Sequence, residues 1–258
     1  MRLLLLFLLL FSTGFFSQNN ISLEFVEKLK KDDKMILFNI DYFGNKYYFN
    51  ENELSKNKKN SFSNFSFGSI SKVDIHDPMK IKIWYKYYST VVILDNYLNE
   101  ITSVNFNNIN IPHNISHIST ANNNYIWVFD ELNMKIKKFD FIKKIFYSGV
   151  EFQMDENVLD LKSNYNFLWI LTEKFFYKLN YNGSVIFKLK NNNFKKISLL
   201  DEHIILNNNS DIVFFNEDKM DFKNLSIEKL FIKDFFVIDE SLYIYDKDHL
   251  YKYLTLIF

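Results

Sequence analysis

The sequence predicts an all-β fold of the β-propeller class, because one strand motif recurs at a regular spacing and turn signals separate its copies. The motif is clearest where residues 124–131, NYIWVFDE, reappear as residues 166–173, NFLWILTE. Alignment on this motif gives one apolar column at steps of 35, 42, 35 and 39 residues, made of Val92, Trp127, Trp169, Ile204 and Tyr243. A four-stranded propeller blade occupies roughly 40 residues, so this period favours a propeller.

Several strands of the motif are apolar on both faces, as residues 126–129 and 167–171 show. Sheets packed between two neighbouring sheets need this pattern, whereas a half-exposed sheet would alternate apolar and polar residues. Radially packed blades are therefore favoured over a two-layer sandwich. Asparagine clusters fall where turns belong, and Asn182-Gly183 is a strong hairpin-turn signal.

Read in order, the chain begins with a hairpin of residues 35–40 and 46–49 around Gly44-Asn45. The later strands are predicted at residues 81–85, 90–94, 100–106, 125–129, 135–141, 167–171, 175–180, 185–189, 203–206, 212–215, 242–245 and 250–256. The column gives five units, and the hairpin makes a sixth if Ile36 joins the column. Six blades are therefore predicted, with five as the alternative.

Two segments fall outside the regular repeat. Ile36 and Val92 are 56 residues apart, and the low-complexity segment 51–69 is predicted to be a surface loop that explains this excess. Residues 23–29 are predicted to form either an entry strand or a short helix. Because the last strand reaches the end of the sequence, the N-terminal segment is expected to complete the last sheet and remove an open edge.

The N-terminus has the pattern of a secretory signal peptide. Arg2 precedes an apolar block at residues 3–11, which is shorter than the about 20 residues that a helix needs to span a bilayer. We expect residues 1–17 to be a signal peptide and residues 18–258 to be a single propeller domain. The alternative is a short membrane anchor, because Phe15 and Phe16 prolong the apolar stretch. Export to the periplasm, the outer membrane or the medium follows from cleavage.

Composition excludes several classes of function. Arg2 is the only arginine, so its removal leaves 30 lysines against 31 acidic residues. Without a basic excess or guanidinium groups, neither nucleic acids nor anionic membranes are expected partners. The chain has no cysteine, which excludes disulfides and a lipoprotein anchor. The hydrophobic fraction of 48% supports a large core.

One stretch resembles a known group of proteins. Residues 77–80, DPMK, and residues 94–101, LDNYLNEI, resemble a family of uncharacterised secreted β-propellers from Bacteroidetes-type bacteria, in which a D-P-[LM]-K segment leads into an L-D-N-x-L-N-E-I hairpin. The resemblance covers about 30 residues, with weaker similarity at the level of single blades. It implies the fold and an exported location, and no catalytic residues.

The same stretch contains a D-x-H-D cluster of Asp74, His76 and Asp77, the candidate binding residues. Carboxylates and imidazole suit a divalent metal, but a site needs further ligands. The favoured interpretation is that Asp77 caps the turn made by Pro78 while His76 lies at the surface, so no metal is predicted. His113 and His117 lie in a predicted loop, where a spacing of four does not place them on one face.

Two hypotheses of function remain. The first is a non-catalytic platform of the cell envelope that binds another protein or an extracytoplasmic polymer. The second is a hydrolase or lyase with an Asp/His site at the channel mouth, which requires Asp74, His76 and Asp77 to converge with His113 or His117. No catalytic or phosphate-binding motif is present, and no cofactor is predicted. The first hypothesis is therefore preferred, and enzymatic activity stays an open question.

Overall fold

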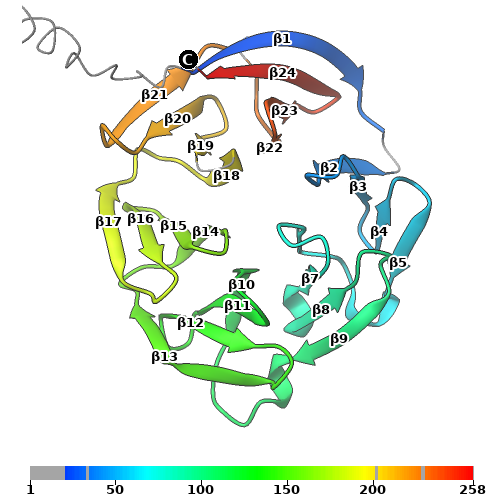
Figure 1. Ribbon diagram of the computed structural model, residues 1–258, viewed down its shortest axis with the longest axis vertical. Coiled ribbons are helices and arrows are strands. Elements are labelled where there is room, and N and C mark those ends of the chain that lie inside the picture. Colours follow the sequence, from blue (N-terminus) through cyan, green and yellow to red (C-terminus); the bar gives the residue numbers. More distant parts are fainter. Residues whose placement is uncertain (1–20, 33–34, 201–202, 228–229, 258) are drawn as a thin grey trace, which may run out of the picture.

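The structure is a computed structural model that describes residues 21–32, 35–200, 203–227 and 230–257. Six four-stranded antiparallel sheets form a ring (Figure 1), which confirms the six-bladed β-propeller. From the inner to the outer strand, the first blade is β2 (Ile36–Ile40), β3 (Lys46–Phe49), β4 (Glu53–Lys56) and β5 (Asn60–Ser63), the second β6 (Lys72–Asp74), β7 (Ile81–Tyr85), β8 (Thr90–Leu94) and β9 (Glu100–Asn105), and the third β10 (Ile115–Thr120), β11 (Tyr125–Asp130), β12 (Lys135–Asp140) and β13 (Ile145–Gln153). The fourth is β14 (Val158–Ser163), β15 (Phe167–Thr172), β16 (Phe175–Asn180) and β17 (Val185–Lys190), the fifth β18 (Lys196–Leu200), β19 (His203–Asn207), β20 (Ile212–Asn216) and β21 (Asp221–Leu225), and the sixth β22 (Asp234–Ile238), β23 (Ser241–Tyr245), β24 (His249–Ile257) and β1 (Ile21–Lys30).

The N-terminal segment closes the ring. Strand β1 pairs antiparallel with β24 from Ile21 to Lys30 and forms the outer edge of the sixth blade (Figure 1). Residues 23–29 are thus a strand and not a helix. The two ends of the described chain share one sheet, so this blade covers the edge that β24 would otherwise expose. The expected signal peptide lies outside the described residues.

The repeating column exists, but three of its predicted members were wrong. Val92 lies on the third strand of its blade, Ile36 lies on a first strand, and Ile204 packs toward the preceding blade. The residues of the second strands that pack toward the following blade are Tyr47, Trp84, Trp127, Trp169, Ile205 and Tyr243. Their steps are 37, 43, 42, 36 and 38 residues, without the 56-residue gap between Ile36 and Val92, and all three tryptophans belong to the column.

Residues 51–69 were also predicted wrongly as a loop. They contain β4 and β5, which complete the first blade, and Leu54 is fully buried. The turn between these strands uses Asn57 and Lys58 at φ angles of 54° and 55°, a left-handed conformation that asparagine tolerates. The polar composition is that of an outer strand and its turn.

The core consists of apolar clusters between successive blades. Trp127 and Trp169 are 2% and 1% exposed and pack in the clusters that join the third to the fourth blade and the fourth to the fifth. Acidic residues that follow the motif strands form turns: Asp95 Oδ1 accepts the N–H of Tyr97 at 2.8 Å, and Asp246 Oδ1 accepts the N–H of Asp248 at 2.7 Å.

A lysine on the third strand lies opposite the aromatic column in four blades. These lysine–aromatic pairs are Tyr47 with Lys56, Trp127 with Lys138, Trp169 with Lys178 and Tyr243 with Lys252. Each ammonium stands 4.7 to 5.7 Å from the centre of the paired ring, within the range of a cation–π interaction. In each pair the lysine side chain runs between two blades, and the aromatic ring stabilises its ammonium group there.

Two of these lysines also join their blade to the next one. Lys56 Nζ donates to the Asn96 carbonyl at 3.0 Å, and Lys138 Nζ donates to the Tyr181 carbonyl. Both carbonyls belong to the turn between the third and fourth strands of the following blade. Within each blade the strands are lettered A to D from the inner to the outer strand. We call the face of the ring that carries the A–B and C–D turns the A–B face. The opposite face, which carries the B–C turns and the connections between blades, is the D–A face.

Candidate functional site

A small cavity opens at the centre of the A–B face. It has a volume of about 260 Å³, and all six inner strands contribute to its wall. Ser119, Ser163 and Ser198 supply hydroxyls, Lys162 supplies a cation, and Asp74 and His76 supply the acid and imidazole that the sequence singled out. Two of the three candidate residues therefore lie at the channel mouth.

Asp74 acts chiefly as a connector between blades. Its Oδ2 accepts the N–H of Thr120 in the third blade at 2.8 Å, and its Oδ1 accepts the N–H of His76 at 3.0 Å. Burial raises the pKa of the Asp74 carboxyl, but the cation of Lys82, the nearby His76 and Lys72 outweigh burial and hold this pKa well below its usual range. Asp74 is thus a fixed anion whose oxygens are already hydrogen bonded.

His76 lines the cavity, whereas Asp77, the next residue in the chain, does not. The His76 side chain is exposed, as predicted, and its ring packs edge-on against Tyr165 of the fourth blade at a centroid distance of 5.0 Å. Desolvation by the residues packed around the ring lowers the pKa of His76, although the negative charge of Asp74 acts in the opposite direction. Asp77 Oδ1 accepts the N–H of Met79 at 3.0 Å, which confirms that Asp77 caps the Pro78 turn.

The other two histidines do not join this group. His113 lies in the connection between the second and third blades, on the D–A face, where its Nε2 contacts the Phe106 carbonyl at 2.8 Å. His117 lies within strand β10, where Nδ1 contacts Ser116 Oγ at 2.9 Å, and not in a loop as predicted. Burial, with the cation of Lys72, lowers the pKa of His117 to about 4. Among the described residues, no three His, Asp or Glu side chains are grouped as metal ligands.

Deeper in the channel, charged groups join the second, third and fourth blades. Lys72 Nζ donates to the carbonyls of Ile118 at 3.1 Å and Leu161 at 2.7 Å, and lies 3.9 Å from Asp160 Oδ1. Burial and the neighbouring Lys162 lower the pKa of Lys72 to about 8, while Asp160 opposes this shift. Asp160 Oδ2 also accepts the N–H of Ile197 in the fifth blade at 2.9 Å. These contacts connect inner strands and leave little of the network free for chemistry.

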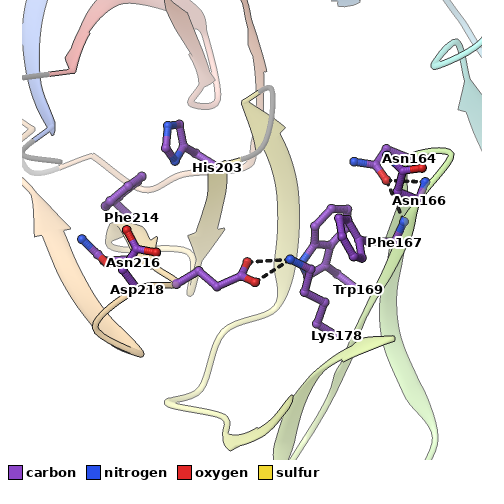
Figure 2. Close-up of a pocket in the computed structure, with 10 residues that line it drawn as sticks. Asn164, Asn166, Phe167, Trp169, Lys178, His203, Phe214, Asn216 and Asp218 are labelled. Carbon is purple, nitrogen blue, oxygen red and sulfur yellow. Dashed lines mark hydrogen bonds and ion pairs between the residues drawn. The ribbon is translucent and has the colours of Figure 1, made fainter. Parts of the chain in front are cut away.

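A larger cavity of about 560 Å³ lies between the fourth and fifth blades, also on the A–B face (Figure 2). Its lining includes Phe167, Trp169 and Lys178 from the fourth blade and His203 and Phe214 from the fifth. In Figure 2 the two groups form opposite walls, and the Lys178 ammonium makes two contacts to a carboxylate between them. These contacts are 2.5 and 2.8 Å long, to the two oxygens of Glu217.

Sequence reasoning missed the lysine–aromatic pairs and this inter-blade cavity. The pairs leave a readable signal, because Lys56, Lys178 and Lys252 each follow their aromatic partner by nine residues and Lys138 by eleven. That spacing is a hairpin in which the two residues face each other across the strands. The cavity has no such signal, since its walls come from separate blades.

Comparisons with known proteins show the fold alone. No protein-family model matches the chain, and no curated protein matches it in sequence. A catalytically inactive virginiamycin B lyase from Staphylococcus aureus, solved with quinupristin, superposes with a TM-score of 0.64 at 10% identity over 91% of this chain and 99% of the lyase. BamB from Moraxella catarrhalis gives 0.57 at 11% identity over 90% and 97% of the two chains.

A third similar structure is PorZ of Porphyromonas gingivalis, described as an essential bacterial surface component of the type-IX secretion system. It superposes with a TM-score of 0.57 at 13% identity over 92% of this chain, which spans 34% of PorZ. At such identities a shared fold carries no activity with it. No helix within the described residues has the length and apolar character to cross a membrane.

Proposed function

We propose that this protein is exported and acts as a non-catalytic binding platform in the cell envelope, in the periplasm, at the outer membrane or outside the cell. Its A–B face contacts an envelope protein or an extracytoplasmic polymer. The observation that carries the proposal is the channel-mouth cavity, to which all six blades contribute and around which Tyr42, Phe43 and Tyr165 are 63%, 66% and 45% exposed. Exposed aromatic side chains around a concavity are typical of binding surfaces.

A hydrolase or lyase at this mouth has less support. That hypothesis needs an acid and a base with free oxygen and nitrogen atoms, but the Asp74 and Asp77 carboxylates accept main-chain N–H groups. His113 belongs to the opposite face. The likeness to virginiamycin B lyase concerns the fold and does not alter this balance.

Site-specific photo-crosslinking in cells tests the proposal. A benzophenone amino acid replaces Tyr42 or Tyr165 on the A–B face, and Tyr87 on the D–A face, where it is 89% exposed, serves as the control. We expect a discrete adduct, identified by mass spectrometry, from the two A–B positions and none from Tyr87. Adducts from Tyr87 alone, or from no position, would contradict the proposal. N-terminal sequencing of the native protein tests export, and an intact leader would favour the anchor.

A further inference from the structure

Four neighbouring segments of the D–A face form one continuous surface, which we call the low-charge sector. Two are the connections from the first blade to the second and from the second to the third, and two are the B–C turns of the second and third blades: residues 64–71, 106–114, 86–89 and 131–134. Hydrogen bonds join each segment to its neighbour, from the Lys86 N–H to Ser71 Oγ at 3.0 Å, from the Phe106 N–H to the Ser89 carbonyl at 2.8 Å and from the Glu131 N–H to the Asn114 carbonyl at 2.8 Å. The four segments are therefore held in fixed positions relative to one another.

Every segment of the low-charge sector presents an apolar side chain to solvent. Phe65 is 78% exposed, Tyr87 89%, Ile111 53% and Leu132 60%. Other aromatic residues of these segments point inward: Phe67 packs against Tyr85 with ring centres 5.4 Å apart, and Phe106 is fully buried. The exposed side chains are thus additional to those that the fold uses for packing.

Charge is unevenly distributed over the D–A face. With histidine neutral, the low-charge sector contains two charged residues, Lys86 and Glu131, which cancel, and its other polar residues are chiefly asparagine and serine. Around the fourth and sixth blades, residues 154–157, 173–174 and 246–248 of the same face are charged at seven of nine positions. The exposed apolar side chains therefore lie where another surface can approach with little loss of ionic hydration.

A lipid headgroup layer fits these features better than a second protein surface. Side chains as exposed as Phe65 and Tyr87 project separately from the backbone. A protein surface would need a matching hollow for each of them, whereas a fluid layer closes around them. Aromatic side chains, and tyrosine in particular, are favoured at the boundary between headgroups and acyl chains. Because the sector has no basic excess, attraction to anionic lipids is not available, and a zwitterionic layer is the matching partner.

We propose that the low-charge sector is a docking surface for a zwitterionic phospholipid layer, into which Phe65, Tyr87 and Leu132 insert. The proposal goes beyond the proposed function, because it concerns the opposite face of the ring. A chain attached to lipid through this sector presents the A–B face, with Tyr42 and Tyr165, away from the layer and toward the partner proposed above.

Flotation of the purified mature protein with vesicles of phosphatidylcholine and phosphatidylethanolamine in equal amounts tests the proposal. We expect equal binding at about 0.1 M and about 1 M NaCl, since salt does not screen apolar contacts. Phe65→Ser and Tyr87→Ser should each weaken binding at least about fivefold, and the double variant should weaken it more. The matched control is Tyr97→Ser in the C–D turn of the second blade, on the A–B face, which should bind as the unmodified protein does. All three side chains are exposed, so these variants should fold.

Absence of flotation at about 5 mM lipid, loss of binding at about 1 M NaCl, or equal weakening by Tyr97→Ser would overturn the proposal. Size-exclusion chromatography without vesicles tests a second copy as the occupant, and a dimer that Phe65→Ser dissociates would also overturn it. A protein adduct from Tyr42 or Tyr165 in a chain that does not float would leave the binding platform intact and reject lipid docking. Flotation without any protein adduct would separate the two in the opposite direction.

Discussion

Replacing Trp127 by alanine should test the inter-blade packing most directly. The Trp127 side chain is 2% exposed, packs in the cluster between the third and fourth blades, and lies under the Lys138 ammonium at 4.7 Å from the ring centre. Large-to-small changes of this kind cost about 3–5 kcal/mol of unfolding free energy, because apolar burial is lost and a cavity remains. Removal of the ring also takes away a cation–π contact worth roughly 1 kcal/mol.

We therefore expect a loss of about 4 kcal/mol, a large part of the 5–15 kcal/mol that is typical of a whole domain. Urea unfolding followed by circular dichroism measures it, since fluorescence would change with the loss of the tryptophan itself. Trp127→Phe keeps a ring beneath Lys138 and should lose less. Tyr87→Ala, at a position that is 89% exposed, should stay within about 0.5 kcal/mol. A loss below about 1 kcal/mol in Trp127→Ala would refute the packing argument.

Three further predictions concern ring closure and the channel. Removal of residues 21–30 should abolish cooperative unfolding and cause self-association, because it exposes the β24 edge; a monomer with an unchanged unfolding curve would contradict this. Asp74→Ala should cost about 2 kcal/mol in urea unfolding because Thr120 loses a charged acceptor, whereas His76→Ala should be near neutral, and equal losses would count against the connector role. The Asp160→Asn variant should have a lower unfolding free energy than the unmodified protein at pH 7, and this difference should shrink toward pH 3. The reason is that the pKa of Asp160 is lowered in the folded state. The stabilisation by Asp160 is therefore present above the unfolded pKa of about 4 and disappears as pH falls through the folded pKa. A difference in unfolding free energy that stays constant with pH would show that Asp160 does not contribute in this way.

The number of blades was predictable because it depends on the spacing of the repeats. Which residue of each strand packs toward the following blade was not predictable. Residues on both faces of β19 are apolar, so Ile204 and Ile205 are equally good members of a column, and a slip of one residue reverses the face. In the second blade, β7 and β8 are both fully buried, and the motif was matched to Val92 instead of Trp84. Only packing against the neighbouring blade separates these choices.

The candidate site was predictable where the interactions are local. The Asp77 cap joins residues two apart, and a sequence shows such turns directly. The hydrogen bond between Asp74 and Thr120 joins two blades and residues 46 apart, so the D-x-H-D segment alone does not predict it. The prediction of a loop at residues 51–69 failed for a related reason, since an outer strand needs few apolar residues and Leu54 alone is fully buried there.

Equivalent positions recur in every blade of a propeller, so the lysine–aromatic pairs of different blades can be compared directly. Tyr47 with Lys56 and Trp127 with Lys138 show what this fold needs at the paired position: an ammonium over an aromatic ring and a main-chain carbonyl of the next turn as acceptor. Neither pair requires a carboxylate. Glu217 at the corresponding turn replaces that carbonyl with its own side-chain carboxylate, so the contact between the lysine and the next turn persists in the fourth blade with a different acceptor.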